Sequence, residues 1–318
     1  MPTPHDALFC QVFSDPRHAA GEIRAVLPTG LAALVDWSTL VAAPTALKDV
    51  ARGDRHADLL FSVEIGSNPT YLYLLLEHKS HDEREPVLRL LEYATRIMLR
   101  HAREHPEEGS LPPVLAVVVH HGPGTFRRAD DLRSRYQLGS GLRAILEGYI
   151  PQFRVVVDDL TRTPPEVLAS RTMSAMAKLV LVTMQRATSN RNLAAILRGL
   201  GSHFAAAHRE GGDPALLAAV LSYLGKVRDT PLREVQEAIR VELGPDMEEM
   251  MISTYDQVLQ EGHARGFAEA LREQIRARFG LIREDLEARI QAADQTELRR
   301  LVIRVLSARN VDEVFAHD

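Results

Sequence analysis

The chain has 318 residues, 45% of them hydrophobic and 25% charged, so it is long enough for two domains and has the composition of a soluble globular protein. A net charge of −5 argues against a protein that coats DNA nonspecifically, and an aromatic content of 5% argues against a stacking platform for single-stranded nucleic acid. The single cysteine, Cys10, cannot form a disulfide within the chain, and the N-terminus shows neither a basic leader nor a long apolar run, so we expect a cytoplasmic protein without membrane contact.

The first predicted elements are a helix and a β-hairpin. Residues 14–28 begin with two capping candidates, Ser14 and Asp15, and read as a helix. Two apolar runs, 57–65 and 70–79, flank the sequence GSNP, which is typical of a turn. These runs therefore predict two antiparallel strands joined by a short loop.

Further helix and strand patterns alternate after the hairpin. Residues 84–104 repeat apolar side chains at helical spacing, and the apolar runs 112–122 and 153–160 read as buried strands. Strands interleaved with helices predict an α/β domain over residues 1–165, with a mixed central β-sheet flanked by helices.

From residue 166 to residue 318 the pattern predicts an all-helical C-terminal region. Its longest helix is expected over about 247–279, and Gly280 should stop it. Gly262 and Gly266 lie four residues apart on that helix. They indicate a close helix contact, which forms either between two copies in a homodimer or within one chain.

Acidic and basic residues gather at the end of the predicted hairpin. Glu77 and Lys79 share one face of their strand, because side chains alternate in direction. If residues 66–69 form a four-residue loop without a bulge, Asp58 lies directly opposite Glu77. The two carboxylates and the lysine should then lie together on one face.

Two carboxylates opposite one another repel, and a divalent cation with oxygen ligands would compensate. Two acids, a metal and a lysine suit phosphodiester cleavage, in which the lysine orients water or stabilises developing negative charge. The alternative is a solvated strand end whose charges have no chemical role, since such a short pattern also arises by chance.

Several motifs follow one another in a characteristic order: HDALFCQVFSDPRHA, ADLLF, YLYLLLEHKS, LRLLEYATRIM, LPPVLAVVVHHG, VVVDDL and the late EGHARGFAEALREQIRARFG. In this order the chain resembles the Rpn family, YhgA-like recombination-promoting nucleases that also carry a transposase name. The motifs cover most of residues 5–160 and again 250–315, and they leave the middle helical part unmatched.

The resemblance implies a PD-(D/E)xK nuclease core and a Mg²⁺ (or Mn²⁺) cofactor. It implies that Asp58, Glu77 and Lys79 are catalytic and that Asp58, Glu77 and the backbone carbonyl of His78 bind the metal. Glu22 is the candidate for an additional acid from an upstream helix. The proline that often precedes the first acid is absent, because Ala57 stands there.

Arginines near the predicted site could contact DNA. Arg89, Arg96 and Arg100 recur on one side of the helix 84–104, and Arg127 and Arg128 follow in a loop. A solvated helix face with neighbouring acids explains the helical arginines equally well.

Histidines also lie near strand ends, but their spacing matches no standard zinc pattern. We therefore expect His120 and His121 to be solvated or capping residues.

These observations favour a metal-dependent DNA endonuclease with DNA as its partner. RNA cleavage by the same site stays open. The alternative from another class is a catalytically degenerate nuclease fold that acts as a helical interaction or regulatory module.

Overall fold

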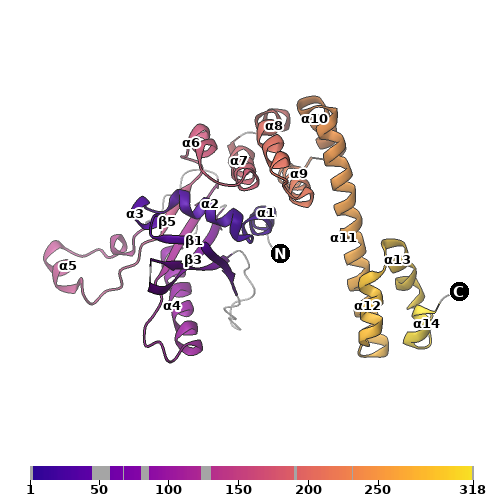
Figure 1. The fold of residues 1–318 in the computed structure, drawn as a ribbon, viewed down its shortest axis with the longest axis horizontal. Helices are drawn as coiled ribbons and strands as arrows, with labels where there is room; N and C mark the ends of the chain where they lie inside the picture. The colour runs from indigo at the N-terminus through magenta and orange to yellow at the C-terminus, as the bar shows by residue number, and fades with distance from the viewer. Residues whose placement is uncertain are drawn as a thin grey trace. The chain divides into compact units, whose positions relative to one another are not determined.

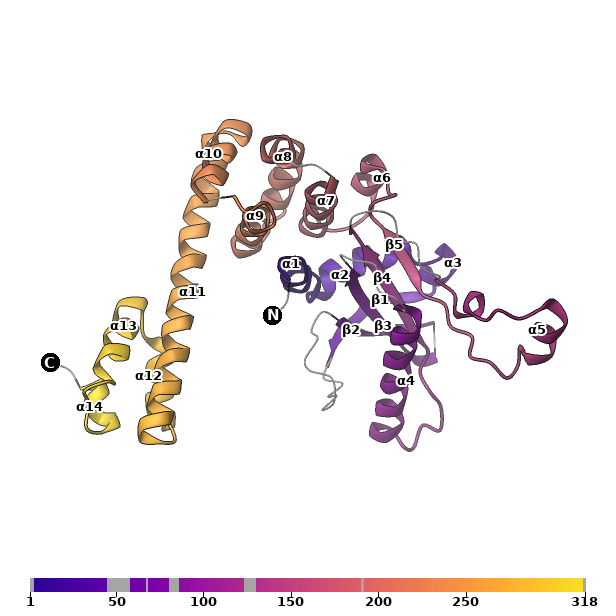
Figure 2. The same cartoon turned by 180° about the vertical axis from the view of Figure 1, so that it is seen from behind.

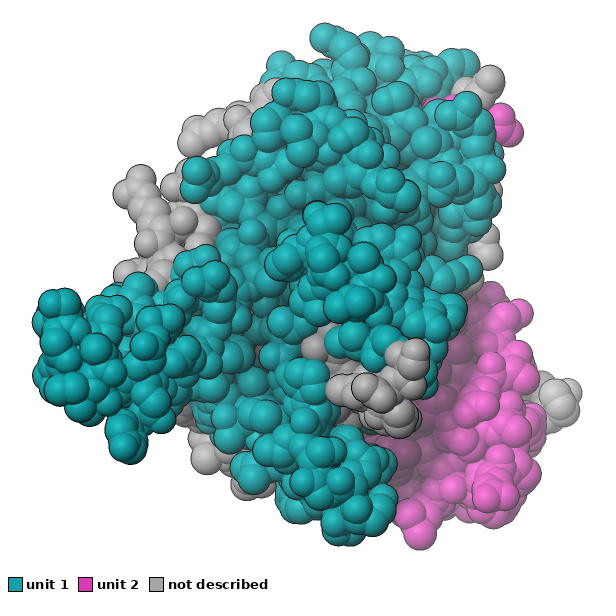
Figure 3. Space-filling model, turned by 60° about the vertical axis from the view of Figure 1, so that its left-hand side comes forward, with its two compact units in different colours: residues 1–245 teal, residues 246–318 magenta. Residues whose placement is uncertain are grey.

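The computed structural model describes residues 3–44, 58–66, 68–79, 86–122, 130–189, 192–230 and 232–316. For Asp58 and for residues 68–79 it describes the backbone alone. The contacts between residues divide the chain into two compact units, Met1–Pro245 and Asp246–Asp318, which Figure 3 shows in teal and magenta.

The first unit is built on a five-stranded mixed sheet with the strand order β1-β2-β3-β4-β5. The strands are β1 (Val35–Ala43), β2 (Asp58–Ile65), β3 (Asn68–Lys79), β4 (Val114–His120) and β5 (Val156–Asp159). β1, β2 and β3 pair antiparallel, whereas β3, β4 and β5 pair parallel. The apolar run of β4 is buried, as expected for a parallel strand covered on both faces. The predicted mixed α/β class is therefore confirmed.

Helices lie on both faces of this sheet. α4 (Pro86–Glu104) lies on one side, where its Val87 and Leu90 share a buried cluster with Val118 of β4. α1 (Pro4–Phe13) and α2 (Pro16–Val26) lie on the other side, as Figures 1 and 2 show. The helix expected over 84–104 and the helix expected after Asp15 are both present.

The hairpin has the predicted pairing but not the predicted loop. Ile65 pairs with Asn68 rather than with Thr70, so the loop is tighter than four residues. An irregularity in the ladder between Glu64 and Ile65 then brings the strands back into the expected register. Gly66 occupies the turn at φ +64°, a left-handed conformation that glycine adopts without strain.

Within the described residues, every strand lies before residue 160 and the elements after it are helices. The remaining helices of the first unit are α3 (Thr29–Ala32), η1 (Leu132–Arg135), α5 (Ser140–Leu146), α6 (Pro165–Ser170), α7 (Ala175–Ser189), α8 (Leu193–Arg209), α9 (Pro214–Arg228) and α10 (Leu232–Leu243). α7 and α9 contact α1, so the compact unit continues to Pro245. The division at residue 165 thus marks a change of secondary structure, and as a domain boundary it stays a prediction.

The second unit consists of α11 (Pro245–Phe279), α12 (Glu284–Ala292), α13 (Gln295–Arg304) and α14 (Val311–Phe315). α11 ends before Gly280, which has φ +88°, as its sequence predicted. Leu271, Ile275, Leu286 and Leu301 are among the residues that form its buried core.

Of the glycine pair on α11, Gly266 has no close neighbour among the described residues. A Cβ atom placed on Gly266 would meet no heavy atom of the described residues within 4 Å. Gly262 lies in a part of α11 whose side chains are not described. A contact between two copies stays a prediction.

Gly21 on α2 gives a first testable prediction. Alanine normally favours a helix interior over glycine by about 1 kcal/mol. Here a Cβ atom would lie 2.4 Å from the Cβ of Met173 and 2.8 Å from its Cα. We therefore expect Gly21→Ala to destabilise the fold by about 1–3 kcal/mol in urea unfolding, because the backbone must move to relieve the overlap.

The matched control is Gly141→Ala in α5, where the same probe meets nothing within 4 Å. That variant should be as stable as the parent or slightly more stable. A Gly21→Ala protein that unfolds at the same urea concentration as the control would contradict the close packing of α2.

Candidate active site at the end of the hairpin

The backbone pairs Asp58 of β2 directly with Glu77 of β3. Directly paired residues of neighbouring strands lie on the same face of a sheet. The predicted register is therefore confirmed, and the two acidic residues lie opposite one another at the sheet edge where β3 ends. Their side chains are outside what the structure describes.

The parallel strands β4 and β5 place further residues beside the acidic pair and Lys79. Glu77 pairs with Val118, which packs against α4, so the acidic pair occupies the sheet face that α4 covers. Lys79 lies two residues further along the same face and pairs with His120. His120 in turn pairs with Asp159 of β5.

His120 is a neighbour of the site that sequence reasoning missed. We expected His120 and His121 to be solvated or capping residues, and the solvated alternative is wrong, because their exposed fractions are 3% and 0%. The carboxyl ends of parallel strands lie at the same end of a sheet. This rule, applied to the sequence, would have predicted that His120 lies beside Lys79.

His121 belongs to a different group of rings. His5 of α1 lies with its ring centroid 4.7 Å from that of His121, and its Nδ1 lies 2.9 Å from the hydroxyl of Tyr223. Burial raises the pKa of Tyr223 well above its usual value. His5 thus reaches the end of β4 but packs beside α9.

Glu22 occupies a buried ionic cluster. Arg171 lies 3.1 Å from Glu22 and binds both carboxylate oxygens of Asp158 at 2.7 Å. Burial and the neighbouring Asp158 raise the pKa of Glu22 well above its usual value. Asp158 pairs with Val119, one residue away from the row of Lys79 and His120, so the cluster lies on the opposite face of the sheet. The structure therefore does not bring Glu22 together with Asp58 and Glu77.

The arginines of α4 have partners within the chain. Arg96 donates a hydrogen bond to Glu92 at 2.6 Å, and Arg100 donates one to the carbonyl of Pro44 at 2.6 Å. The guanidinium of Arg89 lies 5.6 Å from the ring centroid of Tyr93. Arg127 and Arg128 lie outside the described residues.

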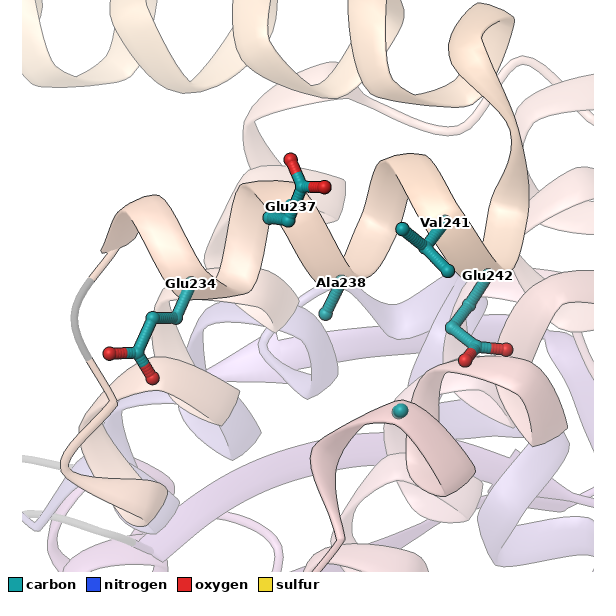
Figure 4. Close-up of a pocket in the computed structure, with 6 residues that line it drawn as sticks. Glu234, Glu237, Ala238, Val241 and Glu242 are labelled. Atoms are coloured by element: carbon teal, nitrogen blue, oxygen red, sulfur yellow. The ribbon is translucent and has the colours of Figure 1, made fainter.

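A pocket of about 380 Å³ lies elsewhere in the first unit, between α10 and α8. Its lining residues are Ala194, Glu234, Glu237, Ala238, Val241 and Glu242, most of which Figure 4 labels. Two of its three glutamates pair with arginines, Glu237 with Arg240 and Glu242 with Arg198. No helix in the described part of the chain is long and apolar enough to cross a membrane.

The family described as "Putative transposase, YhgA-like" matches residues 3–212. The chain belongs to this family. The resemblance found in the sequence is thus confirmed, and the match also includes the helices between 165 and 212 that the motifs had left unmatched.

Curated relatives come from Escherichia coli. "Inactive recombination-promoting nuclease-like protein RpnE" of strain K12 is 26% identical over 299 residues, 92% of this chain and 93% of its own. "Recombination-promoting nuclease RpnD" of O157:H7 is 32% identical over 120 residues, 38% of this chain and 46% of its own. "Recombination-promoting nuclease RpnA" of strain K12 is 32% identical over 122 residues, 38% of this chain and 40% of its own. The chain thus aligns with less than half the length of RpnD and of RpnA. No solved structure matches.

Proposed function

We propose that this chain is a metal-dependent DNA endonuclease with a PD-(D/E)xK-type core. The observation that supports this most is the direct pairing of Asp58 with Glu77, with Lys79 two residues beyond on the same face. Chance pairing of strands rarely places two acids opposite one another, because like charges in this position destabilise a sheet. The relatives named nucleases add support at the level of the family.

The donor set fits a hard divalent cation. Asp58 and Glu77 offer carboxylate oxygens and His78 offers a backbone carbonyl, which are the ligands that Mg²⁺ and Mn²⁺ prefer. A bound ion would polarise the scissile phosphate and lower the pKa of a water ligand. Glu22 would have to leave Arg171 to join, so we limit the proposed set to the other three residues.

Lys79 carries the proposed role in the transition state. Its ammonium group would orient the attacking water or stabilise the negative charge that develops on the phosphate. His120, the paired neighbour of Lys79 on β4, adds a buried imidazole at the same edge.

DNA is the proposed substrate, and the arginines of α4 are its proposed contacts. Arg89, Arg96 and Arg100 lie on the helix that covers the face of the acidic pair. A phosphate could replace the exposed partner Glu92 of Arg96 at little cost, because surface ion pairs contribute little to stability. Arg127 and Arg128 complete the proposed set.

The proposed function is tested by metal dependence. Purified protein should nick supercoiled plasmid in Mg²⁺ or Mn²⁺, and it should leave the plasmid intact in Ca²⁺ or in EDTA, because Ca²⁺ accepts looser coordination and positions water poorly. Single-stranded DNA and RNA of the same sequence define the substrate class. Equal cleavage in EDTA would exclude this mechanism.

A second candidate is a nuclease fold without activity that acts as an interaction module. The specific observation in its favour is that RpnE, which aligns over 92% of the chain, is named inactive. This candidate predicts no cleavage with any metal. It also predicts no Mg²⁺ binding that depends on Asp58 and Glu77.

A further inference from the structure

A second group of potential ligands lies at the far end of α4. The sequence HAREHPEE, residues 101–108, places His101 and His105 one helical turn apart, and Glu107 and Glu108 follow in the turn after the helix. The turn folds back because the backbone N–H of Glu108 donates to the carbonyl of His105 at 3.2 Å.

The distances suit one small cation. His105 Nδ1 lies 3.5 Å from Glu108 Oε1 and 3.9 Å from Glu107 Oε1, and the three ligand atoms all lie within 4.8 Å of one another. In a tetrahedral site with bonds of ~2.1 Å, neighbouring ligand atoms are ~3.4 Å apart. His105 and Glu108 are thus close to this spacing, His105 and Glu107 would approach by about 0.5 Å, and the two glutamates, at most 4.8 Å apart, by up to about 1.4 Å, which rotation of their side chains can supply.

His101 supports this group from inside the protein. Its side chain is 3% exposed, and its Nε2 lies 3.0 Å from Glu108 Oε2, the oxygen that does not face His105. A ligating carboxylate whose second oxygen is hydrogen-bonded to a buried group is a common feature of metal sites. The two histidine rings also pack together, with their centroids 4.6 Å apart.

The electrostatic surroundings favour a cation. The carbonyl end of a helix carries partial negative charge, and α4 ends at Glu104. Arg103 donates to the carbonyl of Leu99, and Arg100 lies 4.0 Å from Glu104. Within the part of the chain that the structure describes, Glu107 and Glu108 have only histidine partners, so no arginine or lysine neutralises them.

We propose that His105, Glu107 and Glu108 bind one divalent transition-metal ion, with His101 as the residue that positions Glu108. An imidazole with two carboxylates suits Zn²⁺ and its neighbours in the first transition series better than Mg²⁺. Three protein ligands leave one position for water or for an exogenous ligand.

This site is distinct from the proposed nuclease centre. α4 has 19 residues, so its two ends are about 28 Å apart. The chain leaves β3 at Lys79, returns along α4, and enters β4 at Val114, which pairs with Tyr73 in the middle of β3. The histidine–glutamate group therefore lies toward the edge of the sheet opposite the acidic pair.

Zinc titration by isothermal calorimetry tests the proposal. The full chain is stripped with a chelator and titrated with Zn²⁺ in excess Mg²⁺, which would compete with Zn²⁺ for the proposed nuclease centre. One saturable Zn²⁺ equivalent is expected. His105→Ala and Glu108→Gln should each weaken it 10-fold or more, because each removes a ligand. Circular dichroism checks that the variants fold, and Glu108→Gln keeps the shape of the side chain.

Controls separate this site from its neighbours and from the nuclease proposal. Glu104→Gln, on the last turn of α4 with its side chain 59% exposed, should bind Zn²⁺ like the parent. So should a chain with Asp58→Ala and Glu77→Ala, which lacks the nuclease ligands. His101→Leu should weaken Zn²⁺ binding about tenfold, because Glu108 loses its buried partner. His101→Gln should bind Zn²⁺ more tightly than His101→Leu, since its amide can still donate a hydrogen bond to Glu108.

Absence of saturable Zn²⁺ binding in the parent chain would overturn the proposal. So would parental affinity in both His105→Ala and Glu108→Gln. Neither outcome depends on DNA cleavage.

Discussion

Asp58→Ala and Glu77→Ala are each expected to abolish plasmid cleavage while leaving the protein folded. Each substitution removes a carboxylate from the proposed metal site, and one remaining acid holds Mg²⁺ too weakly to position it. Each change should also relieve the repulsion between the paired acids, so urea stability should stay the same or rise. Cleavage assays, Mg²⁺ titration and urea unfolding measure the three effects separately.

Lys79→Ala should separate binding from catalysis. The ammonium group is not a proposed metal ligand, so Mg²⁺ binding should be close to that of the parent chain. The rate should nevertheless fall by about 10²–10³-fold, the usual cost of losing one group that stabilises developing charge.

The matched control is Glu64→Ala, an acid on the same strand as Asp58 but at its other end, where it pairs with Tyr71. This variant should cleave like the parent. Metal-dependent cleavage at the parental rate by both Asp58→Ala and Glu77→Ala, in preparations free of contaminating nuclease, would place the active site elsewhere.

The sequence predicted the acidic pair better than it predicted the loop that joins the strands. The predicted register is counted from a four-residue loop without a bulge. Ile65 nevertheless pairs with Asn68, so the loop is tighter than expected and the irregularity in the ladder absorbs the difference. The predicted pairing of Asp58 with Glu77 is therefore confirmed although the predicted loop is wrong, since the geometry of a turn depends on backbone angles such as that of Gly66.

Long-range contacts could not be predicted from the sequence. Glu22 and Arg171 are 149 positions apart, and their hydrogen bond depends on how α2 packs on the sheet. The same holds for His120 and His121, which looked like polar residues at a strand end but are buried by helices. Periodicity shows which elements form, but it does not show which of them meet.

Arg171→Met is expected to destabilise the protein strongly, by about 3–5 kcal/mol in urea unfolding. Arg171 is the only cation paired with Glu22 and Asp158 among the ion pairs of the described residues, and those two carboxyls are 0% and 5% exposed. Removing the guanidinium leaves buried negative charge without a partner. The matched control is Arg17→Met, whose ion pair with Asp15 lies at the surface with the arginine side chain 84% exposed. It should change stability little, and an equal effect of the two substitutions would contradict the importance of burial here.

The same cluster should make stability depend on pH. Two carboxyls share one guanidinium, and burial together with Asp158 raises the pKa of Glu22 well above its usual value of 4.5. Between pH 4.5 and the raised pKa, the folded chain keeps a proton that the unfolded chain has released. The stability that this group contributes is therefore complete below pH 4.5 and is lost as the pH rises through the folded pKa. Glu22→Gln imitates the protonated side chain, so its stability relative to the parent should increase from pH 5 to pH 9 in urea unfolding. A constant difference across that range would show that Glu22 is already ionised in the folded protein.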